Sequence, residues 1–115
     1  MRNSLILVTR AGLGTTLPGD EKFGVEMLDK FLHTLETRPE KPMAICFYTE
    51  GVKATVEDSP FLLALEILEQ DGVRLLACKT CLEYYGLLEQ QAVGETVGMS
   101  DIVGFMAEAD RVITI

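Results

Sequence analysis

The sequence predicts an α/β fold, a three-layer α/β/α sandwich around a mainly parallel sheet of about five strands. Continuous apolar runs, rather than alternating ones, occur at residues 4–9, 43–48 and 73–77, which is typical of strands covered on both faces. Segments with helical spacing of apolar residues separate these runs, and right-handed crossovers then favour a parallel sheet. With 115 residues, the chain is long enough for one domain, 1–115, and too short for two.

The first half of the chain alternates strand and helix. The run at 4–9 is expected to be a central strand, followed at its carboxyl end by a Gly-, Thr- and Pro-rich loop over residues 10–20. Asp20 is expected to cap a helix that ends before Pro39. The apolar residues of this helix recur at three- and four-residue spacing: Phe23, Met27, Leu28, Phe31, Leu32 and Leu35. The run at 43–48 then forms a second buried strand.

The second half continues the same alternation. Ser59 and Pro60 supply an N-cap and a first helical residue for a well-buried helix over residues 61–70. A third strand and a short helical piece follow, and residues 93–98 are expected to be either a short strand or an extended loop. A last helix leads into a terminal strand at 111–115.

Charge and hydropathy exclude several classes of partner. The chain has 18 acidic and 10 basic residues and a net charge of −8, which repels nucleic-acid phosphates and anionic membrane surfaces alike. No apolar stretch approaches the roughly 20 residues of a membrane span, and the run at 5–8 is too short for a signal peptide. A cytoplasmic protein is therefore expected. Three cysteines, an odd number, argue for reduced thiols and against a disulfide framework.

A Cys-x-x-Cys pair, Cys78 and Cys81, follows directly on the third predicted strand. In an open α/β sheet, ligands bind in the crevice at the carboxyl ends of the strands, where the N–H groups of the following helix favour an anion. A thiolate is such an anion and is the nucleophilic form of cysteine, and Lys79 adds a positive charge between the two sulfurs. Cys78 is therefore expected to be more reactive than Cys46, which lies inside an apolar run and is interpreted as a core residue. The two paired thiols are also expected to form a disulfide under mild oxidation.

The cysteines and the glycine-rich loop also allow other interpretations. Zinc would need four good ligands, and only Cys46 and His33 could complete the set, so no metal is expected. A thioredoxin-like dithiol is not favoured, because that pair normally opens a helix after an earlier strand; both cysteines could instead be small buried apolar residues. The lone Gly-x-Gly at 12–14 lacks the rest of a nucleotide-binding fingerprint. A flavodoxin-like flavin site at Thr15 and Thr16 is a minor alternative without a stacking aromatic pair, so no cofactor is expected.

Four short segments carry a family resemblance that covers nearly the whole chain. They are Gly19-Asp20 with Phe23-Gly24, Glu50-Gly51-Val52-Lys53, residues 76–85 with the cysteine pair, and Val93-Gly94 followed by Met99 and Ile102. In their order and spacing the chain resembles the DsrE/DsrF-like sulfurtransferase family, and most closely the DsrE-like domain of the YedF proteins associated with selenium metabolism. Lys79 departs from the pattern, because the family usually has glycine there.

The resemblance implies a sulfur (or selenium) relay protein. In such a protein Cys78 would carry a sulfane atom as a persulfide and pass it to a partner thiol, while Cys81 resolves or releases it. The implied partner is a TusA-like sulfur carrier or another thiol protein. The expected substrate-binding residues around the crevice are Lys79, Thr80, Gly12, Gly19, Asp20, Glu50 and Lys53. The alternative is a non-catalytic subunit of the same fold that binds a small ligand or a partner's tail.

We also expect a homo-oligomer whose crevice is completed near a subunit boundary. Hydrophobic residues make up 48% of the chain. The second helix spreads apolar side chains around more than one face: Phe61, Leu62, Leu63, Leu65, Ile67 and Leu68. The resemblance points the same way, since DsrE-like proteins commonly assemble into trimers, hexamers or related forms. The alternative is a monomer in which this helix is simply buried.

Overall fold

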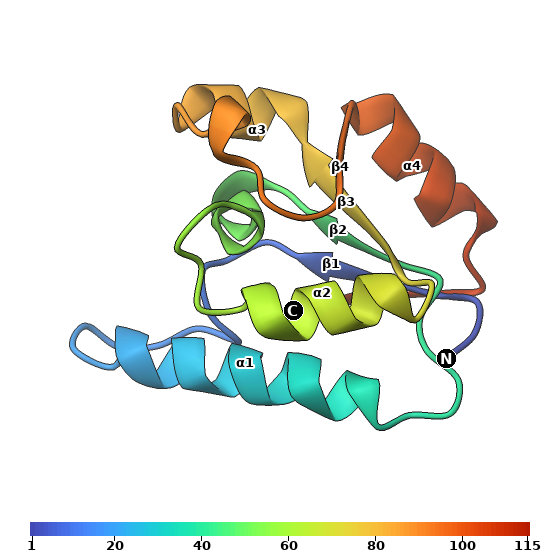
Figure 1. Cartoon of the computed structure of the whole chain (residues 1–115), viewed down its shortest axis with the longest axis horizontal. Coiled ribbons are helices and arrows are strands. Elements are labelled where there is room, and N and C mark those ends of the chain that lie inside the picture. Colours follow the sequence, from blue (N-terminus) through green and yellow to red (C-terminus); the bar gives the residue numbers. More distant parts are fainter.

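A five-stranded parallel sheet forms the middle layer of the fold (Figure 1). The computed structural model describes residues 1–115. The strands are β1 (Ser4–Val8), β2 (Ala44–Phe47), β3 (Arg74–Cys78), β4 (Glu95–Val97) and β5 (Arg111–Thr114). Their order across the sheet is β4-β3-β2-β1-β5, and every neighbouring pair is parallel. The predicted α/β fold with about five strands is therefore confirmed.

Helices cover both faces of this sheet (Figure 1). The long α1 (Glu21–Glu36) and α2 (Leu62–Gln70) lie together on one side and connect β1, β2 and β3 in one direction across the sheet. Two helices, α3 (Lys79–Tyr84) and α4 (Met99–Glu108), lie on the other side in this view. Because β5 lies beyond β1, α4 carries the chain back across the sheet, and right-handed crossovers place it opposite α1 and α2.

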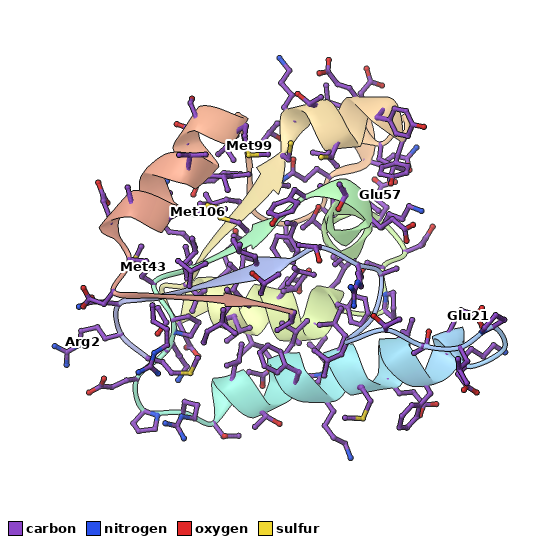
Figure 2. All side chains as sticks on the ribbon, turned by 180° about the vertical axis from the view of Figure 1, so that it is seen from behind. Arg2, Glu21, Met43, Glu57, Met99 and Met106 are labelled. Atoms are coloured by element: carbon purple, nitrogen blue, oxygen red, sulfur yellow. The ribbon has the colours of Figure 1, made fainter.

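The core lies between the sheet and its helices, where side chains from both sides fill the space (Figure 2). Every residue of β1 and β2 is buried, as the continuous apolar runs predict. The inward stripe of α1 consists of Gly24, Leu28, Leu32 and Leu35, and that of α2 consists of Ala64, Leu65 and Leu68. Two expectations are wrong. Phe23, expected on the apolar face of the first helix, is 61% exposed, and Leu63, in the helix expected to be well buried, is 65% exposed.

The ends of several elements differ from the predicted ones. Asp20 occupies the N-cap position of α1, but its side chain makes no capping bond; the Glu21 carboxylate instead accepts the Gly19 N–H at 2.9 Å. Helix α2 begins only at Leu62, although the Ser59 hydroxyl accepts the Phe61 N–H at 3.1 Å. Two segments form 3₁₀ helices, η1 (Thr49–Thr55) and η2 (Leu88–Gln90).

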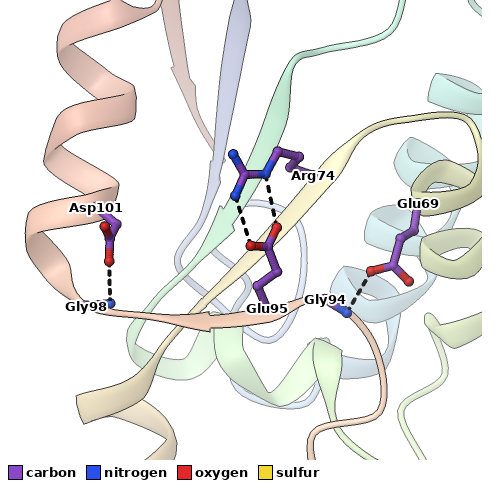
Figure 3. A network of polar contacts seen from close by, with 6 residues as sticks. All are labelled: Glu69, Arg74, Gly94, Glu95, Gly98 and Asp101. Carbon is purple, nitrogen blue, oxygen red and sulfur yellow. Dashed lines mark hydrogen bonds and ion pairs between the residues drawn. The ribbon is translucent and has the colours of Figure 1, made fainter.

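Polar contacts fasten the short edge strand β4 to its neighbour (Figure 3). Arg74 at the start of β3 donates two hydrogen bonds to Glu95, at 3.0 and 2.9 Å, and this bonding lowers the pKa of the Glu95 carboxyl. Glu69 accepts the Gly94 N–H at 3.0 Å just before β4. These contacts matter to the site because β4 pairs with β3 and places Val97 opposite Cys78.

None of the helices has the length and apolar character needed to cross a membrane.

Candidate functional site

The carboxyl ends of β1, β2 and β3 meet at one edge of the sheet, where the sequence predicts a crevice. Three segments surround this edge: the loop over residues 10–20, the 3₁₀ helix η1 and the start of α3. A cavity of about 540 Å³ opens between this loop, the first turns of α1, the start of η1 and Tyr85 at the end of α3. Its lining consists of Thr9, Arg10, Ala11, Gly12, Gly14, Thr15, Thr16, Glu21, Gly24, Val25, Thr49, Glu50 and Tyr85.

The cysteine pair occupies the predicted strand-to-helix junction. Cys78 is the last residue of β3 and the N-cap of α3, and only 2% of it is exposed. Cys81 lies one turn into α3 and is partly exposed. Cys46, in the middle of β2, is fully buried, as expected of a core residue. The structure therefore separates the three thiols into one core thiol and two neighbouring thiols at the sheet edge.

Thr49 connects the cavity to Cys81. Its backbone N–H donates a hydrogen bond to the Cys81 sulfur at 3.0 Å, and its hydroxyl donates to the Thr9 carbonyl at 2.9 Å. Its φ of +49° lies in the left-handed region, which costs a non-glycine residue roughly 1–2 kcal/mol. The surrounding contacts must offset this cost. Thr49 thus holds the end of β1, the end of β2 and α3 together at the cavity wall.

Two of the thiols have raised pKa values. Burial raises the pKa of Cys46 to about 11, so this thiol stays protonated at neutral pH. The pKa of Cys81 is also raised, first by burial and then by a hydrogen bond with Cys78 and the charge that Cys78 would carry as a thiolate. The Thr49 N–H acts in the opposite direction, because it stabilises the Cys81 thiolate. Cys78 and Cys81 are neighbours because they lie three residues apart at the N-terminal end of α3.

Two close glycine contacts shape the walls of the cavity. A Cβ on Gly51 would lie 1.9 Å from the Val8 carbonyl oxygen, so only glycine lets η1 approach the end of β1 this closely. A Cβ on Gly12 would lie 2.7 Å from the Gly24 carbonyl carbon, where the loop after β1 packs against the first turn of α1. Both Gly24 and Gly51 belong to the segments that the sequence analysis singled out, and the structure gives them a packing role.

The structure brings together only some of the predicted substrate-binding residues. Gly12 and Glu50 line the cavity. Lys53 does not line it, but its ammonium lies 4.6 Å from the ring centre of Tyr85, which does. The remaining four, Gly19, Asp20, Lys79 and Thr80, are exposed and lie outside the cavity lining.

Sequence reasoning missed several lining residues, of which Arg10, Thr49 and Tyr85 are the most important. Arg10 donates a hydrogen bond to the Thr15 hydroxyl at 2.7 Å across the loop. Position after a strand was the only sequence signal for Arg10 and Thr49. No three His, Cys, Asp or Glu side chains come together in a way that could hold a metal ion. His33 lies on α1 between Asp29 and Glu36, outside the cavity lining.

An open parallel sheet with helices on both faces, a cavity at its carboxyl edge and a pair of cysteines at the β3–α3 junction define the class of this protein, a three-layer α/β/α protein. A family model described as the DsrE/DsrF-like family matches residues 16–115, and the chain belongs to this family. The sequence resemblance is thus confirmed for the family as a whole. A closer relation to the YedF proteins stays a prediction.

Solved structures share the fold across almost their full lengths. MTH1491 from Methanobacterium thermoautotrophicum, a protein of unknown function, has a TM-score of 0.71 and 20% identity, with 97% of each chain covered. YchN from E. coli has a TM-score of 0.67 and 17% identity, with 100% of each chain covered. BT1422 from Bacteroides thetaiotaomicron, also of unknown function, has a TM-score of 0.60 and 19% identity, covering 98% of this chain and 95% of that one. No curated protein matches the sequence significantly.

Proposed function

We propose that this protein relays sulfur by carrying a sulfane atom as a persulfide on Cys78 and passing it to a partner thiol. The observation that carries the proposal is the pair of neighbouring thiols at the sheet edge, one of them hydrogen-bonded by a residue of the cavity wall. Membership of the DsrE/DsrF-like family supports sulfur relay in general. A TusA-like carrier or another thiol protein is the proposed acceptor.

The chemistry requires two nucleophilic transfers and no redox partner. In the first, the Cys78 thiolate attacks the terminal sulfur of a persulfide presented at the sheet edge, forming Cys78–S–SH and releasing the group that carried this sulfur as a thiolate. In the second, the acceptor thiolate attacks that terminal sulfur and Cys78 leaves as a thiolate. Burial raises the pKa of Cys81, which favours its protonated form, and this thiol can donate a hydrogen bond to the persulfide anion on Cys78.

The surrounding residues suit contact with a second protein. Lys79 and Thr80 are exposed beside the two cysteines at the start of α3, and Gly12 and Glu50 line the adjacent cavity. Exposed Gly19, Asp20 and Lys53 lie on the loop and the 3₁₀ helix that flank it. We assign to this set the binding of the donor and acceptor, with Lys79 favouring the sulfur anions by its charge.

Intact mass spectrometry tests the proposal. The protein is incubated with thiosulfate, or with a cysteine desulfurase and cysteine, and we expect one added sulfur that peptide mapping places in the peptide of Cys78 and Cys81. The double substitution of Cys78→Ser and Cys81→Ser should abolish loading, whereas Cys46→Ala, the matched control in the core, should keep it. Selenocysteine in place of cysteine tests for selenium. If the wild-type protein gains no sulfur from either donor, relay is contradicted and the cavity supports the alternative, a non-catalytic subunit that binds a small ligand or a partner's tail.

A further inference from the structure

We propose that Cys81 is the thiol that meets the sulfur donor, and that the sulfane atom then moves inward from Cys81 to Cys78. This inference rests on the proposed sulfur relay and adds an order to it. In this order, the partly exposed thiol receives the sulfur and the buried thiol stores it. Release to the acceptor follows the same path in the opposite direction.

Exposure distinguishes the two thiols. Cys78 is 2% exposed and lies at the end of β3 between two neighbouring strands, so a donor cannot reach its sulfur while the sheet edge stays in place. Cys81 is partly exposed. It shares a face of α3 with Tyr85, four residues later, and Tyr85 lines the cavity. Cys81 itself does not line the cavity, but its sulfur contacts Thr49, which does.

The Thr49 N–H gives the Cys81 sulfur a fixed hydrogen-bond donor. This N–H belongs to a residue whose backbone is in the left-handed conformation. The hydrogen bond from the Thr49 hydroxyl to the Thr9 carbonyl holds the residue in place. A hydrogen bond from an N–H group to a sulfur stabilises the anionic form of that sulfur. Strained backbone of this kind is concentrated at functional sites. The strained Thr49 places its N–H on the Cys81 sulfur, which supports Cys81 as a reacting group. Cys46, by contrast, has no hydrogen-bond donor at its sulfur among the contacts of the structure.

The two steps balance without an oxidant or reductant. First, the Cys81 thiolate attacks the terminal sulfur of the donor persulfide, the S–S bond of the donor breaks, and Cys81–S–SH forms. Then the Cys78 thiolate attacks that terminal sulfur, the new S–S bond forms on Cys78, and Cys81 leaves as a thiolate. The raised pKa of Cys81 favours uptake of a proton by this leaving thiolate, which draws the sulfur inward. The Cys81 thiol can then hydrogen-bond to the persulfide on Cys78.

Single-turnover loading tests the order. A cysteine desulfurase and cysteine serve as the donor, and the position of the added sulfur is followed over time by rapid alkylation and peptide mapping. In the wild-type protein we expect the sulfur on Cys81 first and on Cys78 later. Cys78→Ser should retain the sulfur on Cys81, and both Cys81→Ser and Cys81→Ala should load Cys78 at least tenfold more slowly. Circular dichroism of each variant verifies folding.

The outcomes separate this inference from the proposed function. If Cys78 loads in Cys81→Ser and Cys81→Ala at the wild-type rate, the inward order is overturned while sulfur relay stands. If the wild-type protein never loads, both fail together. A measurement without any sulfur donor adds an independent check: mild oxidation should join Cys78 to Cys81 in one disulfide, because direct transfer needs the two sulfurs to meet. Two free thiols after oxidation would overturn direct transfer.

Discussion

Cys46, Cys78 and Cys81 are the same residue type in three environments. Cys46 is enclosed by the sheet and its helices, Cys78 ends a strand, and Cys81 accepts a hydrogen bond from Thr49 of the cavity lining. Reactivity of a thiol depends on its thiolate fraction and on its access to solvent, and of the three thiols only Cys81 is partly exposed. With a pKa of about 11, Cys46 is ionised in only about one molecule in ten thousand at neutral pH.

We predict that Cys78 alkylates faster than Cys46 in the native protein at neutral pH. The reason is that Cys78 lies beside the partly exposed Cys81 at the sheet edge, whereas Cys46 is reached only when the core opens. Iodoacetamide labelling with peptide mapping at successive times measures both rates. Labelling in denaturant is the control, since unfolding should make the two rates similar. Equally slow labelling of both in the native state would count against a reactive Cys78.

At the residue scale, the sequence predicted the roles of side chains better than the roles of backbone groups. The cysteine pair and the core position of Cys46 were predictable, because a Cys-x-x-Cys after an apolar run has a recognisable pattern. The part played by Thr49 was not, because it depends on its N–H and on its positive φ, which neither threonine nor its neighbours indicate. Asp20 was predicted to cap α1, but its side chain makes no capping bond, and residue type alone cannot decide this.

The element that brings the site together is η1. It leads away from β2, packs against the end of β1 and carries Thr49 to Cys81 on α3. Its close approach depends on Gly51, whose missing side chain leaves room for the Val8 carbonyl. The Tyr48 N–H donates to that same carbonyl at 3.1 Å. A change at Gly51 therefore acts on the fold and on the cysteine site together.

We predict that Gly51→Ala destabilises the protein by about 3 kcal/mol and lowers persulfide loading. A Cβ 1.9 Å from a backbone oxygen forces η1 away from β1, and backbone atoms cannot yield as a flexible side chain can. Gly104→Ala is the matched control, because a Cβ there meets nothing within 4 Å in the middle of α4 and should stabilise by about 0.5–1 kcal/mol. Urea denaturation measures both changes. Equal stability of the two variants would contradict this account of η1.

At the element scale, long apolar patterns were reliable and short polar ones were not. The buried runs of β1, β2 and β3 and the stripe of α1 indicated the fold class, because tertiary burial and local pattern agree there. Strand β4 was left open as a strand or a loop, since its three residues are not buried and it is fastened by Arg74 and Glu69 from other elements. Contacts with residues distant in the sequence leave no pattern within the strand itself from which β4 could be predicted.

The whole molecule leaves apolar side chains exposed on several elements. Around the site these are Leu17, Phe23 and Tyr84, with exposed fractions of 73%, 61% and 83%. On α4 only Ile102 is buried, while Met99 and Val103 are 48% and 53% exposed and share one helix face, being four residues apart. Met106 of the same helix packs against the core (Figure 2). Met99 and Val103 are the large apolar residues that α4 leaves exposed, and they define its outer face. Single exposed apolar residues are ordinary, but a helix that buries one residue in ten is not.

We predict that the protein forms a homo-oligomer that covers the outer face of α4. Light scattering at micromolar concentration should give a small integer multiple of 12.7 kDa. Val103→Asp should shift the mass toward that of one chain, because it places a charge in the apolar contact. Leu63→Asp is the control, since Leu63, at 65% exposed, is the one large apolar residue that α2 leaves exposed. A wild-type mass near 12.7 kDa would refute the oligomer. An oligomer that persists in Val103→Asp and dissociates in Leu63→Asp would place the contact on α2 instead.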